Sequence, residues 1–292
     1  NSHYLDTNRR MKDLHAKGIS FIGCGISGGA EGALRGPSIM PGGDQHAYEK
    51  VGPILKSIAA KDLNGDPCCH YIGPEGSGHF VKMIHNGIEY AEMQLIAEVY
   101  SILRWAVGLT PDHIAEVLSK WKQSEAASYL LDITVNILRE KGDDGWIIDK
   151  ILDSAGTKGT GGWVVQLAAA LGIPAMMITA ALNARYLSAQ RHIRVHLDDI
   201  TRVPGTKNAS LSTTDIFNAY QLARIINYHE GYALIRSASK KYNWTINLSK
   251  LSATWTNGCI IRSAMMNHFT TLWQDWNDEL ILHPHVKNVI TS

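Results

Sequence analysis

The chain has 292 residues, of which 45% are hydrophobic and 19% are charged, and its formal net charge is +1. This is enough apolar material for one large domain or two modest ones. A charge so close to zero gives no electrostatic reason to expect a nucleic-acid partner or binding to an anionic membrane. The four cysteines form neither a disulfide framework nor a CxxC motif, so we expect reduced thiols and a cytoplasmic location.

Residues 1–76 alternate between helical and strand-like patterns. We expect helices over residues 6–17 and 46–61 and short apolar strands over residues 19–22 and 71–72. This alternation is typical of an α/β domain, but the segment is too small to form a complete doubly wound sheet.

The stretch FIGCGISGGAEGA contains Gly23-x-Gly25-x-x-Gly28, which is the glycine spacing of a dinucleotide-binding turn. A true fingerprint begins a helix at its third glycine, whereas the glycines and prolines that follow here leave little room for one. We therefore reject the nucleotide interpretation. Ser27, Gly28 and Gly29 instead offer a hydroxyl and accessible backbone amides at a strand end, which suits a carboxylate or hydroxyl of a small ligand.

From residue 79 onward the pattern is helical. We expect one continuous helix over 79–107 and a second over 111–122, with Thr110 as its N-cap and Pro111 at its first position. Further helices are expected over 127–141, 147–153, 164–171, 175–192, 213–240, 247–254 and 260–278, with a short C-terminal helical piece and a surface loop over 198–212. The uncharged stretch 163–184 is interrupted at Gly172-Ile-Pro174, so we interpret it as two buried helix segments and not as a membrane span.

The strongest candidate site lies in VKMIHNGIEYAEMQL. Five different functional groups fall at i, i+3, i+4, i+7 and i+8 and share one helix face: Lys82, His85, Asn86, Glu89 and Tyr90. The alternative is a solvated polar face, although such faces usually repeat Glu, Lys, Gln and Ser. The chemistry of a site here would be acid–base. Lys82 becomes a base near neutral pH if burial or nearby cations lower its pKa from about 10.4, and Glu89 is the complementary acid.

The stretch GTKGTGG over residues 156–162 combines accessible backbone N–H groups with the charge of Lys158 and two hydroxyls. Such a combination suits a phosphate. The spacing is not that of a Walker A motif, and a flexible turn between two helices is the alternative interpretation.

Metal ligation is not expected. His192 and His196 are spaced i, i+4, but they lack the glutamate of an H-E-x-x-H motif and lie among Arg and Asp residues. We interpret His283-Pro-His285 as a turn.

Together these pieces resemble the 6-phosphogluconate dehydrogenase family, the decarboxylating enzymes of the pentose phosphate pathway. The resemblance is carried by NSHYLDTNRR, GISGGAEGALRGPSIMPGG, IAAKDLNGDPCCHYIGPEGSGHFVKMIHNGIEYAEMQL, GTKGTGGW, ARYLSAQR and NGCIIRSA. It implies a mainly α fold, with residues 1–76 as the C-terminal part of a Rossmann-like α/β dinucleotide-binding domain. Residues 77–292 would be an all-α substrate-binding and dimerisation domain that is incomplete at its C-terminus.

The resemblance also implies an activity, which is oxidative decarboxylation of 6-phosphogluconate to ribulose 5-phosphate and CO2 with reduction of NADP. Lys82 would take the proton of the substrate 3-hydroxyl, and Glu89 would protonate C1 of the enediol. The implied contacts to the carboxylate and hydroxyls come from Ser27, Gly28, Gly29, His85 and Asn86, and those to the phosphate come from Tyr90, Lys158, Thr160 and Arg185. Asn1 matches the asparagine at the nicotinamide edge of the site. Lys158 and Arg185 would also supply positive charge near Lys82.

The sequence departs from the family pattern at Ala30, where an acidic residue is usual, and at Gly162, where a lysine is usual. The upstream Rossmann half with the dinucleotide glycines is not part of this sequence, so the residues that choose between NADP and NAD are not visible. We therefore expect little dehydrogenase activity from these 292 residues alone. The implied assembly is a homodimer without nucleic-acid or membrane partners.

Two alternatives stay open. One is a related β-hydroxyacid dehydrogenase with a non-phosphorylated acid as substrate, although a neutral substrate tail would leave the charges of Lys158 and Arg185 unpaired. The other is a non-catalytic helical scaffold that only dimerises, although the sequence retains both Lys82 and Glu89.

Overall fold

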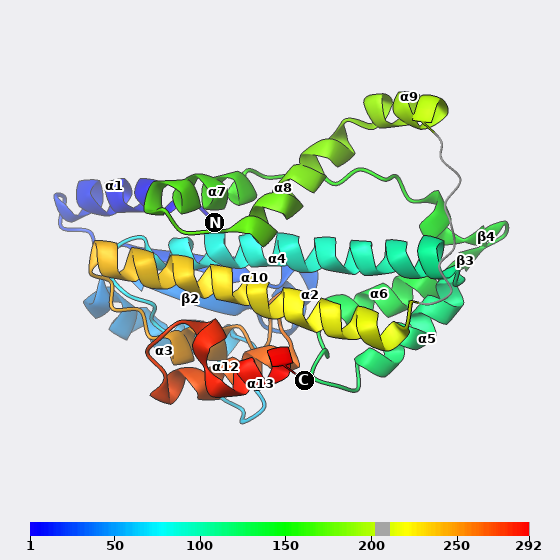
Figure 1. Cartoon of the computed structure of the whole chain (residues 1–292). Coiled ribbons are helices and arrows are strands. Elements are labelled where there is room, and N and C mark those ends of the chain that lie inside the picture. The colour runs from blue at the N-terminus through cyan, green and yellow to red at the C-terminus, as the bar shows by residue number, and fades with distance from the viewer. Residues whose placement is uncertain (202–210, 292) are drawn as a thin grey trace.

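The computed structural model describes residues 1–201 and 211–291, and most of its elements are helices (Figure 1). The chain begins with a small α/β segment made of α1 (Tyr4–His15), β1 (Ile22–Ser27), α2 (Gly29–Arg35), β2 (Ser38–Gly43) and α3 (Gln45–Ile58). Helices follow from residue 77 onward. The prediction of a mainly α chain that opens with a small α/β part is confirmed.

The helices that follow are α4 (Ser77–Ser101), α5 (Pro111–Trp121), α6 (Tyr129–Arg139), α7 (Thr160–Leu171), α8 (Met176–Ala189), α9 (Arg191–Thr201), α10 (Thr213–Tyr242), α11 (Leu248–Thr254), α12 (Ala264–Asp275) and α13 (Pro284–Thr291). Shorter elements are the π-helix η1 (Ile102–Val107), the strands β3 (Lys141–Gly142) and β4 (Gly145–Trp146), and the 3-10 turns η2 (Ile147–Lys150) and η3 (Leu280–Leu282). The side chain of Thr110 accepts from the backbone N–H of His113, so its predicted role as the N-cap of α5 is confirmed.

Several predicted boundaries were wrong. The helix predicted over 175–192 is divided at Gln190 into α8 and α9, and α9 extends into the predicted loop 198–212. Residues 202–210 of that loop lie outside the described residues. The helix predicted over 147–153 is reduced to the single turn η2, and the turn predicted at 283–285 instead opens α13, with Pro284 at the first helical position, which proline favours.

Strands β1 and β2 form an antiparallel hairpin in which Ile22 pairs with Gly43 and Ser27 pairs with Ser38. The glycine-rich stretch is therefore itself a strand. The strand predicted over 19–22 was misplaced, because glycine has little intrinsic preference for strands and only tertiary contacts reveal this one.

The prediction that no helix follows Gly28 was also wrong. The two-turn helix α2 begins at Gly29 and leads directly into the antiparallel partner strand β2. Residues 71–72 form no strand of their own, although Cys69 and Gly73 beside them make single parallel bridges to β2.

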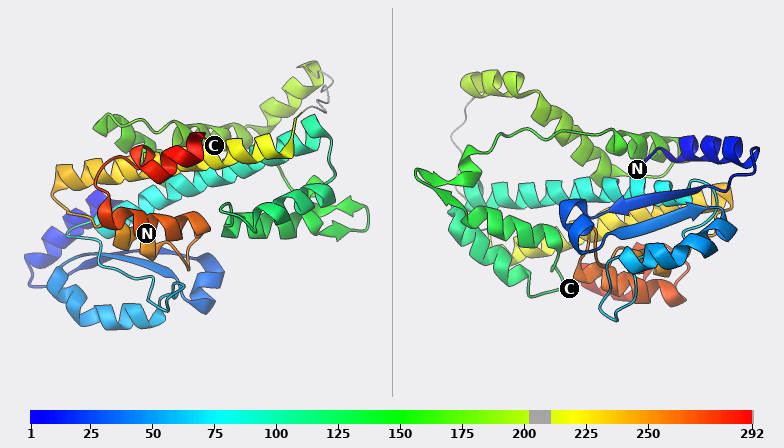
Figure 2. Two further views of the ribbon diagram at one scale, coloured as in Figure 1. Left: turned by 60° about the horizontal axis from the view of Figure 1, so that its bottom comes forward. Right: turned by 180° about the vertical axis from the view of Figure 1, so that it is seen from behind.

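Glycines in the hairpin let α4 lie directly on the two strands (Figure 2). A Cβ atom on Gly25 would lie 2.5 Å from the Cβ of Lys82 and 2.6 Å from the carbonyl oxygen of Gly78. A Cβ atom on Gly23 would lie 2.7 Å from the methyl group of Thr7. Any larger residue at these positions would push the helix away, so the glycine spacing serves strand–helix packing.

Helix α4 runs through the middle of the molecule (Figure 1). It contacts β1 and β2, and it also contacts α7, α8 and α10. Every residue from 77 to 85 is buried, including the polar ones. Because η1 continues α4 to Val107, the continuous helix predicted over 79–107 is confirmed.

The uncharged stretch 163–184 forms most of α7 and the first part of α8, which meet after Gly172, so the prediction of two helix segments is confirmed. They are not fully buried as predicted, because Met176 on α8 is 73% exposed and Gln166 on α7 is also exposed. Among the helices that the structure describes, none combines the length and the apolar character needed to cross a bilayer.

A buried ion pair joins α4 to α10. The Nε of Arg224 lies 2.9 Å from Oε2 of Glu92, and both side chains are inaccessible to solvent. Arg224 also donates to the carbonyl oxygen of Ala126, while Asn227 donates to the carbonyl oxygen of Ile88 and to Glu92. Buried charges are tolerated only when they are paired, so this network fixes the position of α10 along α4.

This ion pair predicts a strong asymmetry between single and double substitutions. Replacing Arg224 by Met leaves the Glu92 carboxylate buried and unpaired, and we expect the free energy of unfolding to fall by about 3–5 kcal/mol. The double variant Glu92→Leu/Arg224→Met removes both charges and is expected to be more stable than Arg224→Met alone. Urea unfolding followed by circular dichroism measures both values.

Arg9→Met is the matched control, because Arg9 forms ion pairs with Asp6 and Asp13 at the surface. Its effect is expected to stay within about 1 kcal/mol. Equal losses for Arg9→Met and Arg224→Met would contradict a structural role for the buried pair.

Candidate functional site

The predicted lysine lies at the centre of a buried chain of polar groups. Lys82 is 5% exposed, and its Nζ lies 2.9 Å from Nδ1 of His85. On the other side of the ring, Nε2 of His85 lies 3.1 Å from Oγ of Ser27 at the end of β1. Oε2 of Glu89 lies 3.6 Å from Nδ1 of the same histidine. The structure thus brings Lys82, His85, Glu89 and Ser27 together around one imidazole.

Burial sets the protonation of this group. It lowers the pKa of Lys82 to about 8, and the nearby Glu89 carboxylate opposes that shift. The pKa of His85 lies well below its usual value, first because the ring is fully buried and second because Lys82 is adjacent. A neutral ring that accepts at Nδ1 from Lys82 carries its proton on Nε2 and donates it to Ser27.

The origin expected for the Lys82 shift needs correction. The resemblance implied that Lys158 and Arg185 lower the pKa of Lys82, whereas burial is its cause in the structure. Arg185 acts instead on Glu89, where it and Lys82 partly offset the rise in pKa that burial causes. Desolvation is sufficient here because α4 is enclosed by strands and helices on several sides.

The interpretation of this helix face as solvated is excluded by the burial of its side chains. Lys82, His85 and Tyr90 are buried, and Asn86 and Glu89 are only partly accessible. Of these side chains, Glu89 and Asn86 keep partial contact with solvent.

The glycines after Ser27 adopt conformations that other residues rarely reach. Gly28 has φ +135° and Gly29 has φ +58°, and a Cβ atom on Gly28 would lie 2.6 Å from the carbonyl oxygen of Gly258. Asn1 lies beside this strand end, where its side-chain amide exchanges two hydrogen bonds with the backbone of Ile26, at 3.1 Å and 2.9 Å.

A second cluster lies two helical turns along the same face of α4. The guanidinium of Arg185 lies 3.7 Å from the ring centroid of Tyr90 and donates to the carbonyl oxygen of Gly156 at 2.7 Å. The hydroxyl of Tyr90 lies 3.4 Å from Oγ1 of Thr157, a contact that the sequence did not single out although Thr157 belongs to the predicted stretch. A Cβ atom on Gly161 would lie 2.8 Å from the Tyr90 ring, so the start of α7 packs against it.

The remaining predicted residues of this cluster lie where α7 begins. Lys158 is exposed, Gly159 takes φ +89° as the N-cap, and Thr160 is the first residue of α7. The N-cap residue Gly159 has no side chain to accept from the first N–H groups of this helix, an arrangement that suits an anion. The segment before α7 differs from the flexible turn of the alternative interpretation, because Arg185 donates a hydrogen bond to the carbonyl oxygen of Gly156.

The glycine spacing in β1 does not form a dinucleotide site. Gly23 and Gly25 face α4 and pack against it, which leaves no space for a pyrophosphate. The rejection of the nucleotide interpretation therefore holds for a different reason than the predicted absence of a helix. Asn1, the one residue predicted to meet a cofactor, lies beside this strand, where its amide is bonded to the backbone of Ile26.

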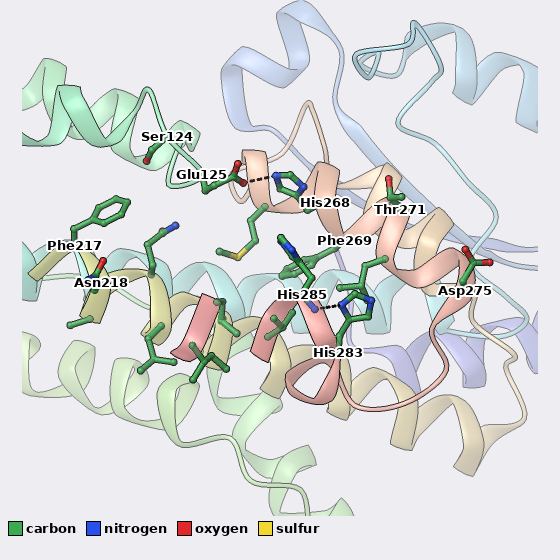
Figure 3. Close-up of a pocket in the computed structure, with 18 residues that line it drawn as sticks. Ser124, Glu125, Phe217, Asn218, His268, Phe269, Thr271, Asp275, His283 and His285 are labelled. Carbon is green, nitrogen blue, oxygen red and sulfur yellow. Dashed lines mark hydrogen bonds and ion pairs between the residues drawn. The ribbon is translucent and has the colours of Figure 1, made fainter. Parts of the chain in front are cut away.

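The structure also contains a pocket of about 870 Å³ away from this site, between α10, α12 and α13 (Figure 3). Its walls are mostly apolar, with Phe217, Phe269 and Val286 among them, and an ion pair between His268 and Glu125 lies at one side. None of the predicted site residues lines it.

Metal-binding geometry is not found among the described residues. No three His, Cys, Asp or Glu side chains of that part of the chain converge as ligands. His192 and His196 lie exposed on α9.

The fold and the clustered side chains define the class of protein, which is a mainly helical chain that opens with a small α/β segment and carries a buried lysine where α4 meets that segment. The sequence model of the 6-phosphogluconate dehydrogenase C-terminal domain matches residues 78–292, and that of the NAD binding domain of 6-phosphogluconate dehydrogenase matches residues 1–73. The chain belongs to the 6-phosphogluconate dehydrogenase family.

Comparison with individual relatives leads to the same family. The chain is 45% identical to the decarboxylating 6-phosphogluconate dehydrogenase of Schizosaccharomyces pombe over 99% of its own length and 60% of that protein. It is 42% identical to the NADP(+)-dependent decarboxylating enzyme of Bacillus subtilis over 100% of its length and 64% of that protein. Plasmodium falciparum 6-phosphogluconate dehydrogenase, whose structures include complexes with NADP+ and with 6-phosphogluconate, superposes with a TM-score of 0.95 at 35% identity, covering 99% of this chain and 64% of that one. The chain thus spans about three fifths of the length of these relatives.

The lowered pKa of Lys82 predicts a pH dependence of stability. Between pH 8 and about 10.5 the folded lysine is neutral while the unfolded lysine still binds a proton, so the contribution of Lys82 to the free energy of unfolding rises with pH in this window. Across this pH window, we expect the free energy of unfolding of the wild type to rise by on the order of 3 kcal/mol relative to that of Lys82→Met.

Urea unfolding at a series of pH values measures this difference. Lys240→Met, which removes an exposed lysine of α10, is the control and should follow the wild-type curve. A Lys82→Met curve parallel to that of the wild type would show that the buried lysine titrates normally.

Proposed function

We propose that this chain carries the substrate site of an NADP-dependent decarboxylating 6-phosphogluconate dehydrogenase, which converts 6-phosphogluconate to ribulose 5-phosphate and CO2. The observation that carries the proposal is the buried Lys82, with its pKa near 8, on the same helix face as Glu89 and the Tyr90–Arg185 cluster. The family membership and the printed activities of the relatives support it.

In the proposed reaction Lys82 is the general base. Neutral Lys82 accepts the proton of the substrate 3-hydroxyl while the hydride of C3 departs. The bound NADP supplies the hydride acceptor. The resulting β-keto acid breaks its C1–C2 bond and releases CO2, and the electrons of that bond remain on the substrate as an enediol.

Glu89 is the proposed acid of the final step. Burial raises its pKa, which favours a protonated carboxyl that can donate to the enediol carbon. Ser27, His85 and Asn86, with the backbone of Gly28 and Gly29, are proposed to hold the carboxylate and hydroxyls.

The phosphate is proposed to bind among Tyr90, Lys158, Thr160 and Arg185. Tyr90 lies eight residues after Lys82, so their Cα atoms are about 12 Å apart along the helix, which is comparable with an extended phosphorylated six-carbon acid. Available N–H groups at the start of α7 and the Arg185 guanidinium suit a dianion. This cationic cluster favours the phosphorylated substrate over a neutral-tailed hydroxy acid.

Two further features belong to the same proposal. Residues 1–76 are proposed to be the end of the dinucleotide-binding domain, with Asn1 at the nicotinamide edge, and residues 77–292 to be the substrate-binding domain. We also propose a cytoplasmic homodimer. All four cysteines are free thiols, which fits a reducing compartment, and Leu187, Ile193 and Leu197 leave apolar surface exposed on α8 and α9.

Calorimetric titration tests the substrate. The 292-residue chain is expected to bind 6-phosphogluconate at least about tenfold more tightly than gluconate, because charge-assisted bonds to the phosphate are added. Arg185→Leu should remove most of that difference. Arg139→Leu is the matched control and should keep it, because Arg139 is an exposed arginine on α6 that donates to Ser119. Equal affinity of the wild type for both ligands would refute the assignment of a phosphorylated substrate.

Turnover tests the base. In a preparation that reduces NADP with 6-phosphogluconate, Lys82→Met is expected to lower kcat by about 10²–10⁴-fold while 6-phosphogluconate still binds. The wild-type kcat/KM should decrease as the pH falls below about 8, because Lys82 becomes protonated. A Lys82→Met variant with wild-type turnover would assign the base to another group.

A further inference from the structure

Helix α8, which carries Arg185, begins without a cap of its own. Its N-cap residue is Ala175, preceded by Pro174, and neither side chain can accept a hydrogen bond from the first turn. Glu230, from the middle of α10, fills this role from 53 residues away. Both of its carboxylate oxygens lie 3.0 Å from the backbone N of Met177, and Oε2 lies 3.3 Å from that of Ile178.

A negatively charged side chain at position 230 suits the start of α8. Its side chain is buried, which raises its pKa, and the N–H groups of residues 176–178 partly offset that rise. A carboxylate at a helix start also interacts favourably with the positive end of the helix dipole. Glu230 is therefore a remote N-cap that ties α8 to α10.

The contact of α8 with α4 does not fix its position by shape alone. Where the two helices meet, Ala181 and Leu182 of α8 share one apolar cluster with Tyr90 and Ala91 of α4, and a Cβ atom on Gly87 would lie 3.1 Å from Ile178. The alanines and the glycine in this contact give shallow ridges and grooves, which resist sliding of the helix less than large side chains do. A directional polar contact at one end then determines where the helix lies along its axis.

The far end of α8 holds the phosphate cluster. Arg185 follows Met177 by eight residues, about 12 Å along the helix, and it lies over the Tyr90 ring while holding the carbonyl oxygen of Gly156. Oγ of Ser188 accepts from the backbone N–H of Ala155 at 2.9 Å. The glycine-rich stretch before α7 is thus attached to α8, and it moves if α8 moves.

We propose that Glu230 is a positioning residue for the phosphate end of the site: by capping α8 it holds Arg185 over Tyr90 and keeps the stretch 155–157 in place. This inference rests on the proposed function, because it assigns the specificity for a phosphorylated substrate to a residue that does not touch the substrate.

Two variants of Glu230 test the inference. Glu230→Ala removes the cap, and we expect the affinity of the 292-residue chain for 6-phosphogluconate to fall by about tenfold, the equivalent of a lost cap, while the affinity for gluconate stays within about twofold. Glu230→Gln keeps one oxygen that accepts from Met177, so it should retain most of the affinity for 6-phosphogluconate. Asn247→Ala removes the N-cap of α11 and is the matched control, since α11 carries none of the site residues.

Hydrogen exchange supplies a readout that needs no ligand. The amides of Met177 and Ile178 should exchange faster in Glu230→Ala than in the wild type or in Asn247→Ala, because they lose their acceptor. Unchanged exchange at these two amides would overturn the capping role.

The outcomes separate the two proposals. If the wild type does not prefer 6-phosphogluconate to gluconate, the proposed substrate fails, whereas the exchange data still decide whether Glu230 caps α8. If the wild type has this preference and Glu230→Ala keeps all of it, the positioning role is overturned. Equal weakening of both ligands, or the same loss in Asn247→Ala, would also overturn it, because general destabilisation would then explain the effect.

Discussion

The site depends on one constraint, which is that α4 is buried along the part of its length that carries ionisable side chains. Glycines in β1 and at the start of α4 let the strands and the helix approach until Cβ atoms could no longer fit. Water is thereby excluded from Lys82 and His85, and desolvation moves the pKa of both groups downward. The glycine spacing that imitates a nucleotide fingerprint serves this approach, so the same stretch creates the environment in which a lysine can act as a base.

The burial of α4 also places a charged side chain out of contact with water, which is unfavourable unless that charge is paired. Glu92 lies three residues after Glu89 on the same helix, and it is enclosed by α10 without access to water. Arg224 and Asn227 provide its hydrogen bonds, while Glu230, three residues after Asn227, faces α8. One helix therefore pairs the buried charge of α4 and caps α8. The stability of the core and the geometry of the Tyr90–Arg185 cluster are linked through α10.

What could be predicted from the sequence follows from the range of the interactions involved. The shared face of Lys82, Glu89 and Tyr90 and the cap at Thr110 are local, because helical periodicity and capping act over a few residues. Strand β1 and the break at Gln190 were missed or misplaced, since glycine-rich strands and helix interruptions are decided by tertiary contacts. For the lowered pKa of Lys82, the sequence left burial and nearby cations open as causes, because the burial of a side chain depends on the elements that pack around its helix. Nothing near Glu230 or Arg224 in the sequence indicates partners 53 and 132 residues away.

The arrangement separates binding from chemistry along one helix. The Lys82–His85–Ser27 chain lies where α4 meets the hairpin and is rigid, because each member is buried and bonded to the next. The Tyr90–Arg185 cluster lies where α4 meets α7 and α8, which are partly exposed, and α8 is held at its start by a residue of α10. Changes near the hairpin should therefore act mainly on the protonation of the base, whereas changes in α7, α8 or their supports should act mainly on ligand affinity. In the proposed function, both ends of the site are fixed to the same helix, so that a substrate held by its phosphate would be presented to Lys82 at a constant distance. The accuracy of that presentation would depend on how firmly α8 is held.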